Sequence, residues 1–114
     1  MGTIFDKILA KKIPADVVYE DDQVLAFKDI NPQTKVHVLV IPKSKLERFS
    51  DLQHSDDKSV GQFFRGVSRV ASELGLDDDG YRVILNCGKH GCQTVEYIHA
   101  HIMGGQQLLG WDIK

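Results

Sequence analysis

The sequence has few cysteines and prolines, no excess of basic charge and no long apolar run. Its two cysteines, Cys87 and Cys92, are too few for a disulfide scaffold. A formal net charge of -2 argues against binding through phosphate neutralisation, so no nucleic-acid partner is expected. The apolar stretches are too short to span a bilayer, and Asp6 interrupts any signal-peptide pattern, so no membrane partner is expected either. These absences predict a cytoplasmic protein, small enough to diffuse into the nucleus.

Length and composition suit one compact domain. The 114 residues are 42% hydrophobic and 26% charged, which allows a modest core. Thr3 and Asp6 form a capping-box pattern before apolar residues at helical spacing, which predicts a short helix ending before Pro14. A second, longer helix is expected between Ser55 and Leu74, with Ser55 as its N-cap.

Short runs of β-branched and apolar residues, bounded by turn residues, predict five strands. These runs cover residues 17–19, 24–28, 37–41, 81–86 and 95–103. Strands grouped with only two helices indicate an α+β fold. We expect a mainly antiparallel five-stranded sheet with one short N-terminal helix and one long central helix.

The last predicted strand carries the chemical signal. Alternation places Tyr97, His99 and His101 on one face of that strand. Histidines two residues apart in a strand lie about 7 Å apart, so both rings can address one small ligand. The preceding loop contains Gly88 and Gly91, and glycines let backbone N–H groups turn toward an anion. Taken separately, these features also fit surface histidines and a plain hairpin loop.

Several segments, in their order along the chain, resemble the Hint branch of the histidine triad (HIT) superfamily. They are I-F-D-K-I at 4–8 with I-P-A at 13–15, F-K-D-I-N-P at 27–32, H-V-L-V-I-P-K at 37–43, Asn86 with G-C-Q-T-V at 91–95, and H-A-H-I-M-G-G at 99–105. The resemblance implies a HIT-like domain over residues 3–105 and a C-terminal tail over 106–114.

The resemblance also implies a function: a purine nucleotide-binding hydrolase that cleaves nucleoside 5′-phosphoramidates without a metal or cofactor. His99 would attack phosphorus, His101 would donate to a phosphate oxygen or the leaving group, and His37 would support the cluster. Asp29 would accept hydrogen bonds from the ribose. The apolar slot for the purine would be lined by Ile4, Phe5, Ile8, Ile13, Phe27 and Ile30. The phosphate and leaving group would be held by Asn86, Gly91, Gln93, Thr94 and the Val95 N–H.

Relatives of this kind form homodimers through the long helix and a shared sheet. The apolar residues of the helix between 60 and 70 exceed what a small sheet needs to cover, which also favours a homodimer. The tail would bring Trp111 near the partner's site.

Tyr97 departs from the family pattern, because it stands where the first of three alternate histidines is expected. A nucleophilic imidazole attacks through one nitrogen while an acceptor holds the proton on the other. In the family that acceptor is the backbone carbonyl of the first position, and Tyr97 still provides one. We therefore expect the change to affect rate and pH dependence more than the existence of the reaction.

Other functions stay open at this stage. Zinc could be bound by the soft and borderline ligands Cys87, His90, Cys92, His99 and His101, although their spacing matches no common zinc motif. A nucleotide-binding module with little turnover is a second alternative, which Tyr97 favours. A dinucleoside polyphosphate hydrolase is a third, and a small interaction domain with incidental histidines is a fourth.

Overall fold

The structure is a computed structural model that describes residues 2–110, and within them five strands form one antiparallel sheet. The strand order is β1-β2-β3-β5-β4, and every neighbouring pair is antiparallel. This arrangement confirms the expected α+β fold. None of the described helices is long and apolar enough to cross a membrane. The elements are α1 (Ile4–Leu9), β1 (Val17–Glu20), β2 (Val24–Lys28), β3 (Val36–Pro42), the 3-10 helix η1 (Phe49–His54), α2 (Asp57–Glu73), β4 (Arg82–Leu85) and β5 (Ala100–Gly104).

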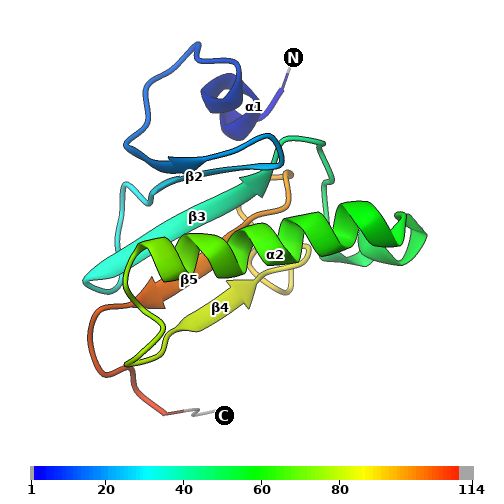
Figure 1. Cartoon of the computed structure of the whole chain (residues 1–114). Coiled ribbons are helices and arrows are strands. Elements are labelled where there is room, and N and C mark those ends of the chain that lie inside the picture. The colour runs from blue at the N-terminus through cyan, green and yellow to red at the C-terminus, as the bar shows by residue number, and fades with distance from the viewer. Residues whose placement is uncertain (1, 111–114) are drawn as a thin grey trace.

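The long helix α2 covers one face of the sheet, and it crosses in front of the strands in Figure 1. Gly66 permits this close approach, since a Cβ there would lie 2.7 Å from Cγ1 of Val24 on β2. The buried side chains of this layer alternate along the strands. The core cluster consists of Val24, Ala26, Val38, Val40, Phe63, Val67, Val70, Ala71, Leu76, Ile98, Ala100 and Ile102.

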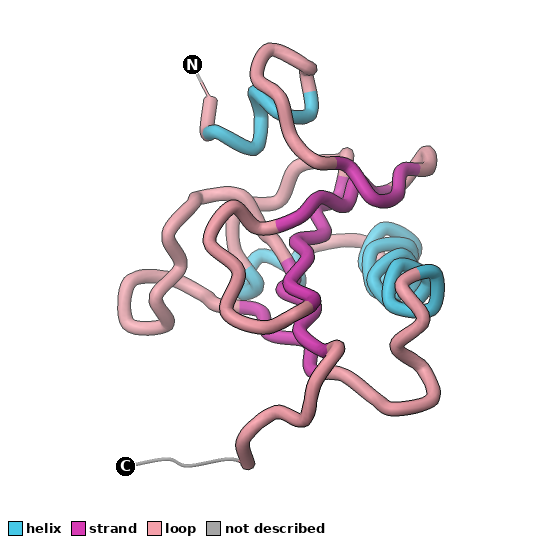
Figure 2. Tube along the Cα trace, turned by 90° about the vertical axis from the view of Figure 1, so that its left-hand side faces the viewer, coloured by secondary structure: helices cyan, strands magenta, loops and turns pink. Residues whose placement is uncertain are grey.

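The opposite face of the sheet is covered by α1 and by loops, which lie on the other side from α2 in Figure 2. A second buried cluster forms there, made of Phe5, Leu25, Phe27, Leu39, Ile41 and Tyr97. By the same alternation, His37 on β3 and His101 on β5 lie on this face. The fold therefore separates a helix-covered core from a face that carries the histidines.

The capping box at the start of α1 is confirmed. The Thr3 hydroxyl oxygen accepts from the Asp6 N–H at 3.2 Å, and the Thr3 N–H donates to Asp6 Oδ2 at 2.6 Å. Lys45 Nζ lies 2.9 Å from the same carboxylate oxygen. The capping box and the ion pair with Lys45 therefore share the Asp6 carboxylate, and the ion pair ties α1 to the chain after β3.

The prediction that Ser55 caps α2 was wrong by one residue. Asp56 is the N-cap, and its carboxylate accepts the Ser59 N–H at 3.0 Å. Ser55 instead ends η1, an element the sequence did not indicate, and its hydroxyl donates to the Asp51 carbonyl at 3.2 Å. A carboxylate one position later took the capping role that either side chain can perform.

The last strand is also shorter than predicted, because β5 begins at Ala100 rather than near residue 95. The preceding backbone bonds elsewhere: the Ile98 N–H donates to the Leu46 carbonyl at 2.7 Å, and the Tyr97 N–H donates to the Val95 carbonyl at 2.8 Å. These bonds take the segment before β5 out of the ladder. His99 consequently sits just before the strand, not within it.

Candidate active site

Three histidine rings meet on the face of the sheet opposite α2. The ring centroids of His99 and His101 are 5.1 Å apart, and those of His37 and His101 are 5.2 Å apart. His37 and His99 are buried, with 6% and 5% of their surface exposed. The pairing of β3 with β5 brings His37 against His101, where the resemblance implied that it would support the cluster.

His99 is held with one ring nitrogen free. Its Nδ1 lies 2.8 Å from the Tyr97 carbonyl, and a carbonyl can only accept, so Nδ1 carries the proton and Nε2 keeps a lone pair. Burial lowers the pKa of His99, opposed by the bond to Tyr97 and the charge of Asp29. The edge-on ring of Phe5, 4.9 Å away between centroids, packs against the imidazole. His99 is therefore neutral at neutral pH, with Nε2 available to act as a nucleophile.

A chain of hydrogen bonds sets the protonation of the other two rings. The Gln33 N–H donates to His37 Nδ1 at 3.0 Å, so the His37 proton is on Nε2. That Nε2–H faces His101 Nδ1 at 2.9 Å, which leaves the His101 proton on its own Nε2. Within the described residues His101 Nε2 is buried without a hydrogen-bond partner. Burial, then His99 and His37, lower the pKa of His101 to about 4. His101 thus presents an unused N–H donor at neutral pH.

Asp29 directly follows β2 and lies beside this chain of hydrogen bonds, which we call the histidine relay. Its Oδ1 accepts the Asn31 N–H at 2.8 Å, and its Oδ2 lies 3.4 Å from His37 Nε2. A carboxylate has further acceptor capacity, and 18% of the Asp29 side chain is exposed. Asp29 can therefore accept hydrogen bonds from ligand hydroxyls while staying near the histidines.

Among residues 2–110, one group of potential metal ligands is close enough to share an ion: Asp29, His37 and His101, whose ligand atoms lie within 4.8 Å of one another. The donor set does not fit a metal in this protonation state, because the proton on His37 Nε2 occupies the coordinating position. Among the residues that the structure describes, the two cysteines join no such ligand group. Cys87 Sγ lies 3.7 Å from the Ser50 hydroxyl, and Cys92 is exposed.

The loop between β4 and β5 is a closed turn. The Gln93 N–H donates to the Gly88 carbonyl at 3.0 Å and the Cys92 N–H to the Lys89 carbonyl at 3.1 Å, with Cys92 at φ 62°. This is the hydrogen-bond pattern of a Schellman motif, with a cysteine in the left-handed position that glycine usually takes. A Cβ on Gly91 would lie 2.5 Å from the Cys87 carbonyl oxygen, so only glycine fits there.

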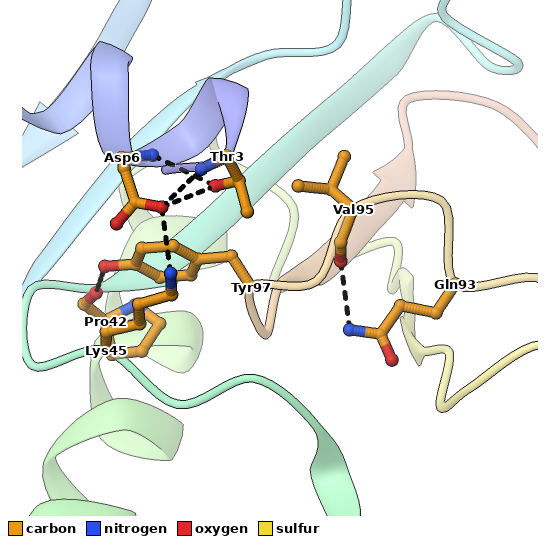
Figure 3. Close-up of polar contacts among 7 residues, drawn as sticks. All are labelled: Thr3, Asp6, Pro42, Lys45, Gln93, Val95 and Tyr97. Atoms are coloured by element: carbon orange, nitrogen blue, oxygen red, sulfur yellow. Dashed lines mark hydrogen bonds and ion pairs between the residues drawn. The ribbon is translucent and has the colours of Figure 1, made fainter. Parts of the chain in front are cut away.

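Gln93 is engaged by the loop itself rather than left open for a ligand. Its amide nitrogen donates to the carbonyls of Glu47 at 2.6 Å and Val95 at 3.0 Å, the second of which Figure 3 shows. Its amide oxygen accepts the Gly88 N–H at 2.9 Å. Of the neighbouring residues, Asn86 is half-buried and Thr94 is exposed.

The apolar residues expected around a purine differ in exposure. Phe5 and Phe27 are buried with centroids 5.5 Å apart, and Ile8 and Val95 pack at the edge of their cluster. In contrast, Ile4 is 48% exposed and Ile30 is 97% exposed, while Ile13 is half-buried. Trp111 lies outside the described residues.

Sequence reasoning missed the part played by Gln33. Its contribution is a backbone N–H, which every residue except proline offers, so the residue type carries no signal. The Tyr97 carbonyl was expected from the resemblance, and the structure places it against His99.

The fold and this cluster define a small α+β protein in which one buried histidine keeps a free ring nitrogen and a second presents an unused N–H donor. A family model, the HIT domain, matches residues 10–108. The chain belongs to the HIT domain family.

Known relatives cover nearly the whole chain. It is 41% identical over 106 residues to a purine nucleoside phosphoramidase of Escherichia coli K12, covering 93% of this chain and 89% of that protein. It is 48% identical over 109 residues to a 14 kDa zinc-binding protein of Zea mays, covering 93% and 84%. A histidine triad protein from Clostridium difficile superimposes with a TM-score of 0.85 at 41% identity, covering 96% of this chain and 95% of that one.

Proposed function

We propose that the protein is a purine nucleotide-binding hydrolase that cleaves nucleoside 5′-phosphoramidates through a covalent nucleotide on His99. The observation that carries the proposal is the hydrogen bond from His99 Nδ1 to the Tyr97 carbonyl, which leaves Nε2 free to attack. The Escherichia coli relative, named a purine nucleoside phosphoramidase, supports the substrate class.

The first step forms a bond between His99 Nε2 and phosphorus and breaks the bond between phosphorus and the amine. The amine leaves with a proton taken from a solvent water, and the hydroxide that remains is neutralised by the proton released when a second water attacks phosphorus. The nucleotidyl-imidazolium that results keeps its Nδ1–H on the Tyr97 carbonyl, which stabilises its positive charge. Water then attacks phosphorus, releasing the nucleotide and restoring neutral His99. One nucleophile thus serves both displacements.

His101 would stabilise the transition state in both steps. Its unused Nε2–H can donate to a phosphoryl oxygen, and the relay from Gln33 through His37 keeps that proton on Nε2. A donor already in place costs no reorganisation when charge develops. His37 would therefore act through His101.

The remaining residues would bind the nucleotide. Asp29 would accept hydrogen bonds from the ribose hydroxyls. The purine would lie against the exposed apolar side chains of Ile4 and Ile30, above Phe5 and Phe27. Ile8 and Ile13 would extend this slot. The phosphate would be met by the loop after β4, with contributions from Asn86, Gly91, Thr94 and the Val95 N–H. Gln93, whose amide is engaged within the loop, would hold the shape of that loop instead of contacting phosphate.

We further propose that the protein acts as a cytoplasmic homodimer. β4 is an edge strand, and Val83 on it is 41% exposed. Phe64 on α2 is 43% exposed as well. An exposed apolar residue on an edge strand, together with another on α2, favours pairing with a second copy.

A trapping experiment tests the proposed reaction. Wild-type protein is mixed with a purine nucleoside 5′-phosphoramidate, quenched during turnover and mapped by peptide mass spectrometry. We expect a nucleotidyl adduct on the peptide that carries His99, and release of the free amine. Nucleotide binding without amine release would instead favour a binding module, the function that Tyr97 in place of a histidine would suggest.

A further inference from the structure

Tyr97 is held by hydrogen bonds at both its backbone and its side chain. Its N–H donates to the Val95 carbonyl at 2.8 Å, and its hydroxyl donates to the Pro42 carbonyl at the end of β3 (Figure 3). The side chain is fully buried, with the Phe5 ring edge-on at 6.2 Å between centroids. Burial and the charge of Asp6 raise the pKa of Tyr97 to about 12, so the hydroxyl remains a donor at physiological pH.

The carbonyl that holds His99 belongs to a peptide unit that is itself anchored. The Tyr97 carbonyl and the Ile98 N–H are parts of one planar trans peptide, so fixing one direction fixes the other. The Ile98 N–H donates to the Leu46 carbonyl at 2.7 Å. The opposite edge of that peptide therefore directs the Tyr97 carbonyl to His99 Nδ1, 2.8 Å away.

All but one of these anchors come from the same stretch of chain, residues 42–47, which begins with the last residue of β3 and which we call the carbonyl connector. The carbonyls of Pro42, Leu46 and Glu47 accept from the Tyr97 hydroxyl, the Ile98 N–H and the Gln93 amide, respectively. Lys45, in the middle of the connector, has its Nζ 5.4 Å from the centroid of the Tyr97 ring and bound to Asp6. The carbonyl connector thus forms three hydrogen bonds with the segment before β5.

We propose that Tyr97 is a positioning residue for the nucleophile: its hydroxyl, bonded to the carbonyl connector, fixes the backbone carbonyl that holds the Nδ1 proton of His99. The side chain reaches the reacting atoms only through its own backbone. This role rests on the proposed function only for its effect on rate, since the tautomer of His99 is a property of the free protein.

The test is Tyr97→Phe, which removes the hydroxyl and keeps the ring. We expect kcat on a purine nucleoside phosphoramidate to fall about three- to tenfold with KM unchanged. The acid limb of the pH–rate profile shifts to lower pH, because a weaker bond to the carbonyl removes a contribution that raises the His99 pKa. We expect nitrogen NMR of the free variant to show His99 as a mixture of tautomers, and that of wild type to show Nδ1–H alone.

The matched control is Tyr19→Phe. Tyr19 also donates through its hydroxyl, to Asp21 Oδ2 at 2.8 Å, but on β1 and away from the histidines. It should lose stability without changing kcat, the acid limb or the His99 tautomer. A Tyr97→Phe variant that behaves like Tyr19→Phe overturns the positioning role.

Failure of the variant to fold and absence of turnover in wild type would each leave the positioning role testable. If Tyr97→Phe does not fold, 3-fluorotyrosine at position 97 replaces it, because its hydroxyl is a stronger donor. The acid limb should then shift to higher pH, and an unchanged limb overturns the proposal. If wild type shows no turnover, the proposed function fails, while the NMR tautomer of His99 in wild type and Tyr97→Phe still decides the positioning role.

Discussion

His37 Nε2 and His101 Nδ1 face each other at 2.9 Å, and a single proton lies between them. The Gln33 N–H occupies the other nitrogen of His37, so that proton belongs to His37. A backbone N–H donor outside the cluster, that of Gln33, therefore determines which nitrogen of His101 carries the proton. An ion bound between Asp29, His37 and His101 would have to displace this proton.

Turnover should therefore survive metal removal. We expect exhaustive chelation to leave the rate of phosphoramidate hydrolysis unchanged, because backbone N–H groups and imidazoles handle the phosphate charge. Metal analysis of the chelated protein checks that removal is complete. Loss of activity that returns on adding zinc would contradict this expectation and give the zinc-binding name of the maize relative a functional meaning here.

Removing the nucleophile should separate catalysis from binding. His99→Ala is expected to abolish hydrolysis while mononucleotide affinity stays within about tenfold, or roughly 1.4 kcal/mol. Steady-state kinetics and calorimetric titration measure the two effects. His90→Ala, which removes an exposed histidine of the β4–β5 loop, should change neither. Wild-type turnover in the His99 variant would exclude the covalent mechanism.

A dimer through the β4 edge should be sensitive to charge at that edge. We expect light scattering to give the mass of a dimer for wild type at micromolar concentration and of a monomer for Val83→Arg. Val17→Arg is the control, because Val17 is 47% exposed on β1, the opposite edge of the sheet. A monomer mass for wild type, or dissociation by Val17→Arg alone, would place the interface elsewhere or remove it.

Acid should destabilise the fold partly through His101. Its pKa is about 4 when folded and about 6.5 when unfolded, so the unfolded chain binds more protons between these values. The free energy of unfolding is therefore highest above pH 6.5 and falls as the pH decreases to 4, by on the order of 3 kcal/mol from this group. Denaturant titrations should show a weaker pH dependence for His101→Gln. His54→Gln, an exposed histidine of η1, should match wild type.

Local patterns were sufficient for much of the fold and for the placement of the histidines. The strand 24–28 was predicted with its observed bounds, and the alternation around His99 identified the correct face. Predictions went wrong where two local solutions compete, as at the α2 cap, or where a distant carbonyl decides, as at Ile98 and Leu46. The closed loop of Gln93 depends on such distant partners too.

The carbonyl connector also bears on when the site can exist during folding. Its Pro42 and Leu46 carbonyls meet partners more than fifty positions further along the chain, at Tyr97 and Ile98. Contacts this distant close late, because a long loop must be ordered before they form. A chain in which α2 and the first three strands have assembled would still lack an oriented His99. We therefore expect competence for catalysis to arise together with the completion of the sheet.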